Sequence, residues 1–236
     1  MPEASILEIK DVVKRFGGIT AVNHCSLSIG AGKIHGLIGP NGSGKTTLFN
    51  CITGLERLQG GEIRFRGERI DGLKPYQVAR RGIGRTFQII RVFPQLTTFE
   101  NLLAVTTEPI EVARKRAEEL LSFVTLTRLK DEYAGNLSHG QQKLLEFIRV
   151  LMNDPELILL DEPAAGVNRT LLNELLTAMT RLRDAGKTIL IVEHDMKVVM
   201  GLCEAVYVLD YGEKIAEGPP SVIRSNERVI EAYFGR

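Results

Sequence analysis

Two hydrophobic periodicities alternate along the chain. Short runs of mostly apolar or β-branched residues predict buried strands over 6–10, 34–38, 62–65, 157–160, 188–192 and 205–209. Elsewhere, apolar residues recur every three or four positions, which predicts amphipathic helices over 112–124 and 170–182. Strands that alternate with helices in this way predict an α/β fold around a largely parallel sheet.

The strand pattern is missing from one part of the chain. From about residue 89 to residue 137 helical periods dominate. We interpret residues 89–137, together with the start of a helix predicted over 142–152, as a helical subdomain. A chain of 236 residues fits one large domain, spanning 1–236, with such an insertion.

Composition and charge narrow the classes of function. With 44% hydrophobic and 25% charged residues, the chain resembles an ordinary globular protein and not a disordered or fibrous one. Thirty basic and 29 acidic residues give a net charge of +1, which argues against a nucleic-acid partner. The longest apolar runs fall far short of the roughly 20 residues of a membrane span. Residues 1–10 do not have the order of a signal peptide, so we expect a cytoplasmic protein.

The three cysteines give no sign of a redox or metal function. Cys25, Cys51 and Cys203 lie far apart and form no CxxC pair. An odd number at such spacing predicts neither a disulfide framework nor a zinc site. We interpret all three as small buried apolar residues.

A phosphate-binding loop follows the strand predicted over 34–38. It consists of Gly39, Pro40, Asn41, Gly42, Ser43, Gly44, Lys45, Thr46 and Thr47. Its glycines let backbone N–H groups approach phosphate oxygens, and the next helix points its positive end at them. We expect Lys45 to reach the β- and γ-phosphates, Thr46 to bind Mg²⁺, and Ser43 and Thr47 to add polar contacts. The alternative is a glycine-rich turn before a helix.

A pair of acids ends the strand predicted over 157–160. Asp161 and Glu162 follow the apolar run directly, and ligands collect at the carboxyl ends of strands in open α/β sheets. Asp161 fits a Mg²⁺ ligand and Glu162 a residue that activates water. On its own, such a pair is as consistent with a strand end that reaches solvent, so its functional interpretation depends on the phosphate-binding loop.

Residues 137–141, Leu-Ser-His-Gly-Gln, resemble the signature motif of ABC-type ATPases. In that family the signature of one subunit completes the nucleotide site of another. The resemblance therefore implies that Ser138, His139, Gly140 and Gln141 contact ATP held by a second subunit in a head-to-tail dimer. His139 replaces the glycine usual at its position. The alternative is an ordinary helix start, because Ser138 and Gln141 also form a plausible capping box.

Other segments match the ABC cassette in the expected order. Phe16 matches an aromatic residue that stacks on adenine, with Val22 nearby; Gln88 matches a glutamine that contacts Mg²⁺ and water and links the ATP site to a membrane partner. His194 matches a switch histidine that senses the γ-phosphate. Residues 164–168 match a loop that crosses the dimer interface. Taken alone, Phe16 would be a core residue, Gln88 unremarkable and His194 structural.

The resemblance extends over essentially the whole chain. In segments such as 84–88, 162–166, 193–196 and the tail 229–235, the chain is similar to ATP-binding subunits of importers for branched-chain amino acids and related hydrophobic or amide substrates. It implies a P-loop NTPase core with a mostly parallel sheet, an N-terminal antiparallel β part and an inserted helical subdomain.

The resemblance also implies a mechanism and partners. Glu162 and His194 orient a water for attack on the γ-phosphate of MgATP, and Lys45 with the partner's signature residues stabilises the developing charge. The expected partners are a second ATPase subunit, two multi-span permeases and a periplasmic or extracellular solute-binding protein. These partners place the chain at the cytoplasmic face of the inner or plasma membrane.

Three other functions remain open. A soluble ABC ATPase of DNA repair or of the ribosome usually carries a long coiled coil or two cassettes, and this chain holds one P-loop and one signature. In a P-loop kinase or GTPase, the matches at the signature and at His194 would be accidental. The third alternative is an importer of the same type for urea, short amides or another small solute. The sequence does not distinguish between these solutes, because the ATP-binding subunit does not touch the solute.

Overall fold

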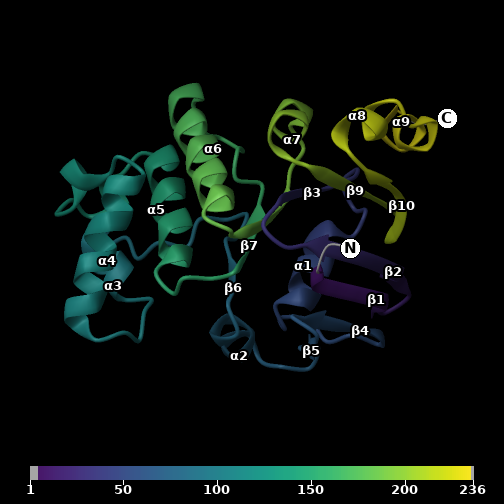
Figure 1. The fold of residues 1–236 in the computed structure, drawn as a ribbon, viewed down its shortest axis with the longest axis horizontal. Coiled ribbons are helices and arrows are strands. Elements are labelled where there is room, and N and C mark those ends of the chain that lie inside the picture. The colour runs from purple at the N-terminus through teal and green to yellow at the C-terminus, as the bar shows by residue number, and fades with distance from the viewer. Residues whose placement is uncertain (1–4, 235–236) are drawn as a thin grey trace.

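Six strands form the central sheet of the computed structural model, which describes residues 5–234 (Figure 1). Their order is β10-β9-β3-β8-β7-β6. The strands are β3 (Ile34–Ile38), β6 (Ile83–Arg85), β7 (Leu157–Asp161), β8 (Thr188–Val192), β9 (Ala205–Asp210) and β10 (Glu213–Gly218). Neighbours from β6 to β9 run parallel, and β10 pairs antiparallel with β9. The mostly parallel α/β fold is confirmed.

Strands in the middle of this sheet are covered on both faces. Every residue of β3, β7 and β8 is buried. Because side chains alternate along a strand, Leu157 and Leu159 pack into one apolar cluster, whereas Ile158 and Leu160 pack into another on the opposite face. This double burial is why these strands are mostly apolar in the sequence.

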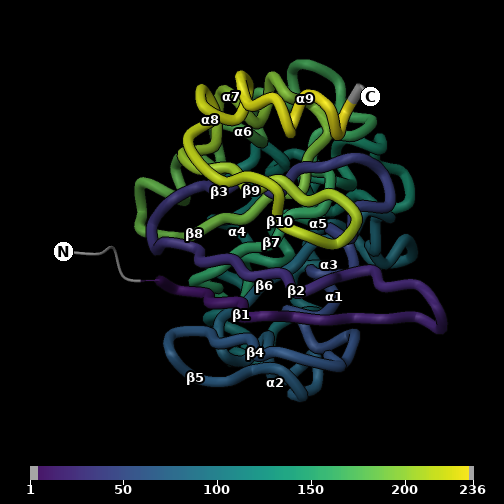
Figure 2. The backbone as a smooth tube through the Cα atoms, turned by 90° about the vertical axis from the view of Figure 1, so that its right-hand side faces the viewer, coloured from purple at the N-terminus to yellow at the C-terminus, as the bar shows by residue number. Residues whose placement is uncertain are grey.

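A second, antiparallel sheet contains the N-terminal part of the chain. Its strands are β1 (Ser5–Phe16), β2 (Ile19–Gly30), β4 (Gly60–Phe65) and β5 (Glu68–Arg69), in the order β2-β1-β4-β5. Figure 2 shows this sheet below the central sheet and the C-terminal helices above it. The strands predicted over 6–10 and 62–65 are parts of β1 and β4. The implied N-terminal antiparallel part is confirmed.

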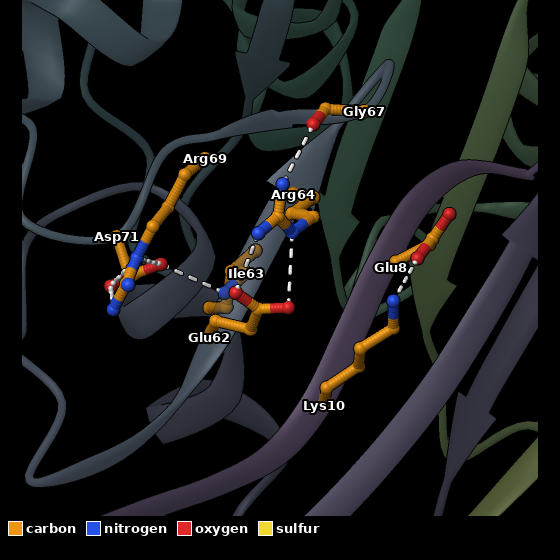
Figure 3. Close-up of polar contacts among 8 residues, drawn as sticks. All are labelled: Glu8, Lys10, Glu62, Ile63, Arg64, Gly67, Arg69 and Asp71. Carbon is orange, nitrogen blue, oxygen red and sulfur yellow. Dashed lines mark hydrogen bonds and ion pairs between the residues drawn. The ribbon is translucent and has the colours of Figure 1, made fainter.

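Charged side chains line the outer face of the antiparallel sheet (Figure 3). Glu8 lies opposite Arg64 across the β1–β4 pair, and Lys10 lies opposite Glu62. Arg64 donates two hydrogen bonds to Glu62, of 3.0 and 2.9 Å, and this contact lowers the pKa of Glu62. The alternating neighbours are buried on the inner face: Leu7, Ile9, Ile63 and Phe65. Exposed ion pairs add little stability, so these charges chiefly keep one face of the sheet in water.

Helices cover both faces of the central sheet. Helix α1 (Lys45–Ile52) and the antiparallel sheet pack on one face. Three helices, α5 (His139–Leu151), α6 (Arg169–Asp184) and α7 (Met196–Leu202), pack on the other. The remaining helices are α2 (Pro75–Arg80), α3 (Thr98–Leu103), α4 (Ile110–Phe123), α8 (Pro220–Arg224) and α9 (Glu227–Phe234). The helices predicted over 112–124, 142–152 and 170–182 are confirmed as α4, α5 and α6.

The stretch 89–137 contains α3, α4 and two short 3₁₀ turns, Thr127–Leu129 and Ala134–Asn136. Figure 1 shows α3 and α4 at the opposite end of the molecule from α8 and α9. Within residues 5–234, no helix has the length and apolarity needed to cross a membrane. Gly235, the last residue of the tail similarity, and residues 1–4 lie outside the described part of the chain.

The buried cysteines lead to a first prediction. Burial raises the pKa of Cys25 and Cys203 to about 12 and that of Cys51 to about 11, from an ordinary 9.0. Because the thiolate is the reactive form, we expect the folded chain to resist iodoacetamide at pH 8 and the unfolded chain to gain adducts at all three, counted by mass spectrometry. Since the folded pKa values are raised, the stability these thiols contribute is present below about pH 9 and is lost as the pH rises toward 12. Rapid labelling of the folded chain would contradict their burial.

Candidate active site

The loop after β3 has a backbone that only glycine fits at two positions. A Cβ atom at Gly39, where φ is 150°, would collide with the carbonyl oxygen of Leu209, and one at Gly44, where φ is 99°, would collide with that of Ala21. Gly44 is also the N-cap of α1, and no side chain caps this end of the helix. The first amides of α1 are therefore directed at the loop without a side-chain acceptor, which fits phosphate binding.

The ammonium of Lys45 lies inside this loop. Its Nζ donates hydrogen bonds to the carbonyl oxygens of Gly39 and Pro40, both at 2.8 Å, and to Ser43 Oγ at 3.3 Å. The side chain is only 5% exposed, and this burial lowers the pKa of Lys45, an effect that the charges of Glu162 and Asp161 oppose. The structure thus places a buried cation beside uncapped backbone amides, an arrangement suited to a polyphosphate.

Asp161, the last residue of β7, carries a buried oxygen atom that has no hydrogen-bond partner among the described residues. This atom is Oδ1, whereas Oδ2 accepts a hydrogen bond from Arg85 at 3.3 Å. Burial raises the pKa of Asp161, and the charge of Arg85 opposes that shift. A buried carboxylate oxygen without a donor fits a hard cation.

The other predicted metal ligands contribute an amide and a hydroxyl. Gln88 is exposed in the loop after β6, and Thr46 is exposed on the first turn of α1. Within residues 5–234, no group of three or more His, Cys, Asp or Glu side chains could hold a metal ion by itself. This agrees with Mg²⁺ chemistry, because that ion usually binds one or two carboxylates together with substrate phosphates. The residues present therefore fit Mg²⁺.

Glu162 lies at the centre of three converging segments. Its Oε1 is 2.9 Å from Nε2 of His194, and its Oε2 accepts a hydrogen bond from Gln88 at 3.2 Å. Its backbone has a φ of 50°, and its N–H donates to Val192 at 2.9 Å. The structure thus brings together three residues that lie 74 and 32 positions apart in sequence. A carboxylate between an imidazole and an amide can orient a water molecule for attack.

The signature residues form the start of α5. Ser138 Oγ accepts a hydrogen bond from the Gln141 amide at 3.4 Å, and Gln141 Oε1 accepts one from the Ser138 amide at 2.9 Å. The predicted capping box is thus confirmed. Ser138 and His139 are exposed, and a Cβ atom at Gly166 would lie 3.0 Å from the His139 ring. In the part of the chain described, no hydrogen bond or ion pair joins residues 138–141 to the P-loop.

Phe16 and Val22 differ in exposure. Phe16 ends β1 with 45% of its surface exposed, and the Lys14 ammonium lies 4.6 Å from its ring centroid. The core interpretation of Phe16 is therefore wrong, and its ring is accessible for stacking. Val22 is fully buried within the apolar cluster between the two sheets. The alternation along β2 turns this side chain inward, so it has no exposed surface in this structure, and its contact with a nucleotide stays a prediction.

Three charged residues at the site were not predicted from the sequence. The Arg85 side chain is only 6% exposed. It donates hydrogen bonds to Asn50 Oδ1 at 2.7 Å and to Asp161, and so connects α1 to β7. Lys143 donates a hydrogen bond to the carbonyl oxygen of Glu162, and Glu193 accepts one from the amide of Ala164, two residues further along the same loop. One signal in the sequence was available for Glu193, which directly follows the apolar run 188–192, where an unpaired charge is costly.

Comparison with known proteins agrees with this geometry. Residues 22–165 match the ABC transporter family, and residues 213–236 match the family described as branched-chain amino acid ATP-binding cassette transporter. The chain is 39% identical to the high-affinity branched-chain amino acid transport ATP-binding protein BraF of Pseudomonas aeruginosa, over 98% of each chain.

Solved structures show the same fold. A nucleotide-free ATP-binding cassette from an ABC transporter superimposes with a TM-score of 0.92 at 34% identity, over 99% of this chain and 100% of that one. A dimeric cassette in a post-hydrolysis state, bound to ADP and Pi, gives 0.81 at 29% identity, over 91% and 98%. The chain therefore belongs to the ABC transporter family, as an ATP-binding cassette that hydrolyses ATP.

Proposed function

We propose that this chain is the motor subunit of an importer for branched-chain amino acids. The observation that carries the proposal is the match of residues 213–236 to the branched-chain amino acid cassette family, in a chain whose relative BraF is named for that transport. A P-loop kinase or GTPase does not account for the ABC match over residues 22–165. A motor for urea or short amides and a soluble ABC ATPase are the outcomes that the experiment below must separate from it.

The chemistry follows from the groups gathered at the P-loop. The amides at the start of α1 and the Lys45 ammonium hold the phosphates, and Phe16 stacks on adenine. Glu162 orients the attacking water together with His194. Mg²⁺, held by Thr46, Gln88 and Asp161, would neutralise charge that develops on the phosphates. The support is the unpartnered Oδ1 of Asp161 and the 2.9 Å contact between Glu162 and His194.

A second cassette completes the site in this proposal. Ser138, His139, Gly140 and Gln141 contact the ATP held by the partner's P-loop, and the positive end of α5 faces the γ-phosphate. Two observations support this arrangement. Ser138 and His139 are exposed, and a similar cassette is a dimer bound to ADP and Pi. The second cassette is either a copy of this chain or a related subunit.

A groove beside Gln88 is suited to the membrane partner. It has a volume of about 440 Å³ and is lined partly by Phe87, Arg91, Phe93, Val105 and Arg149. Two rings are stacked against guanidinium groups: Arg91 lies 4.0 Å from the Phe87 centroid, and Arg149 lies 4.7 Å from that of Phe93. A permease segment bound here would contact the segment that carries Gln88. Because Gln88 donates a hydrogen bond to Glu162, movement of the permease could displace the Glu162 carboxylate. The chain would then lie at the cytoplasmic face of the membrane as a peripheral subunit.

Phe93→Asp is expected to weaken the attachment to the permeases by about tenfold or more, because Phe93 is a half-exposed apolar residue at an interface and a carboxylate would have to be desolvated there. Binding of ATP to the isolated chain is expected to stay unchanged. The measurement is the amount of permease recovered with the tagged chain from native membranes. Val222→Asp on α8, which is similarly exposed at the other end of the molecule, is the matched control. Equal recovery with both variants would contradict this role for the groove.

The experiment that tests the proposed function is a pull-down from native membranes with this chain as bait, followed by mass spectrometry and an ATPase assay. Two multi-span permeases and a solute-binding protein are the expected result. That binding protein is then titrated with leucine, isoleucine, valine and urea. Preferential binding of urea would mean that the importer carries urea and not branched-chain amino acids, while the proposed role of this chain as its ATPase would stand. Recovery of soluble or nucleic-acid partners alone would overturn transport.

A further inference from the structure

We propose that Glu193 and Lys143 are positioning residues for ATP hydrolysis, which fix the backbone around Glu162 without touching ATP. The inference rests on the proposed role of Glu162 as the residue that orients the attacking water. Glu193 directly follows β8, and Lys143 lies in α5, two residues after the signature.

The carboxylate of Glu193 holds two loops at once. It is 2% exposed. One of its oxygens, Oε1, accepts a hydrogen bond from the Ala164 amide at 2.7 Å, and the other, Oε2, accepts one from the His194 amide at 3.1 Å. Ala164 belongs to the loop that begins at Glu162. A single buried side chain therefore fastens the segment of the catalytic carboxylate to the segment of the switch histidine.

Lys143 contacts the same loop at the backbone of Glu162 itself. Its Nζ donates a hydrogen bond to the carbonyl oxygen of Glu162 at 2.8 Å. Burial lowers the pKa of Lys143, and the charges of Glu193, Glu146 and Glu162 oppose this shift and favour the ammonium. Because α5 begins with the signature, Lys143 connects the helix that would face the partner's ATP to the backbone of Glu162.

Glu162 needs such support because its backbone conformation is unusual. A φ of 50° is disfavoured for any residue with a side chain, and such a conformation persists only where the surroundings determine it. Its N–H is bonded to Val192 and its carbonyl to Lys143. If these contacts or those of Glu193 are lost, the backbone can relax toward negative φ. That rotation would carry the carboxylate away from His194 and Gln88.

The variant Glu193→Gln tests the positioning role of Glu193. Glutamine has nearly the same size but one acceptor oxygen, so its NH₂ group would face the amide of either Ala164 or His194. We expect kcat for ATP to fall about 10- to 100-fold, the scale of a displaced catalytic group, and KM for ATP to stay within about threefold. Lys143→Met should have a similar effect, and Lys143→Arg should restore most of the rate.

The assay uses the full-length chain, with Glu162→Gln as the reference. If Glu193 acts through Glu162, the double variant Glu162→Gln/Glu193→Gln should hydrolyse ATP no more slowly than Glu162→Gln alone. Like Glu162→Gln, Glu193→Gln should also accumulate an ATP-bound dimer on size exclusion, which a merely unfolded variant cannot do. Glu119→Gln and Lys115→Met, both exposed on α4, are the matched controls.

Each outcome decides the inference. An unchanged kcat in Glu193→Gln, while Glu162→Gln is inactive, overturns the inference and leaves the role of Glu162 standing. Loss of ATP binding in parallel with kcat also overturns it, because it assigns Glu193 to the fold and not to catalysis. If Glu162→Gln itself hydrolyses ATP as fast as the unaltered chain, the proposed function of Glu162 fails, and the positioning roles fail with it.

Discussion

Glu162→Gln is expected to retain ATP binding and to lower the rate of hydrolysis by about 10²–10⁴-fold, the usual contribution of a positioned general base. The substitution keeps the size of the side chain but removes its charge. The carboxylate accepts a hydrogen bond from Gln88 and pairs with His194, so a neutral amide loses the attraction for a water proton and for the imidazole. The P-loop groups that hold the phosphates are unchanged.

Single-turnover hydrolysis of radiolabelled ATP, together with ATP affinity from nucleotide-induced thermal stabilisation, measures both halves of this prediction. The variant should also remain as an ATP-bound dimer on size exclusion, since dimer opening follows hydrolysis in the proposed cycle. Glu68→Gln on β5, an exposed carboxylate on the edge strand of the antiparallel sheet, is the control. Turnover within a few-fold of the unaltered chain would remove Glu162 from its proposed role.

The convergence of the site has a simple cause in the sheet. Parallel strands place their carboxyl ends along one edge, and the order β3-β8-β7-β6 sets the neighbours there. The P-loop follows β3, and Glu193 and His194 follow β8. Asp161 ends β7 and Glu162 comes directly after it, and Gln88 follows β6. Residues far apart in the sequence therefore meet because their strands are adjacent. The same edge brings the buried charges of Lys45 and Asp161 close enough to influence each other's pKa.

The fold could be predicted from the sequence where burial is complete. Strands β3 and β8 were located to the residue because every position in them is buried, and β8 is entirely apolar or β-branched while β3 has three large apolar residues. Strand β2 was missed, since buried and exposed residues alternate along much of it. The two outer strands β6 and β10 were also missed, because one is three residues long and the other carries charges at a sheet edge.

The candidate site also has one part that the sequence predicts and another part that it does not. The P-loop is contiguous, so its glycines, Lys45 and Thr46 could be identified together. Arg85, Lys143 and Glu193 act through partners 76, 19 and 29 residues away. No local pattern identifies the partners of these charges, since the contacts exist only once β6, β7, β8 and α5 are packed. Phe16 and Val22 show a further limit of the sequence, because they lie close together along the chain while one side chain is exposed and the other is buried.

Lys45→Met should weaken ATP binding by about 10- to 150-fold, which corresponds to the roughly 1.5–3 kcal/mol of a hydrogen bond to a charged group. The methionine keeps the apolar stem of the side chain within the loop and removes the ammonium. That ammonium, held between the carbonyl oxygens of Gly39 and Pro40, is the buried cation positioned to meet β- and γ-phosphates. Hydrolysis should fall further than affinity, because charge grows on the phosphates during the reaction.

Titration of a fluorescent ATP analogue gives the affinity, and unfolding without nucleotide separates a binding defect from a folding defect. That separation matters here, because the substitution also leaves the carbonyl oxygens of Gly39 and Pro40 without their donor. Lys10→Met, which removes an exposed cation paired with Glu8 on β1, should change neither quantity. An unaltered affinity in Lys45→Met would mean that the backbone amides of the loop and of α1 bind the phosphates on their own, and that Lys45 serves only to close the carbonyl side of the loop.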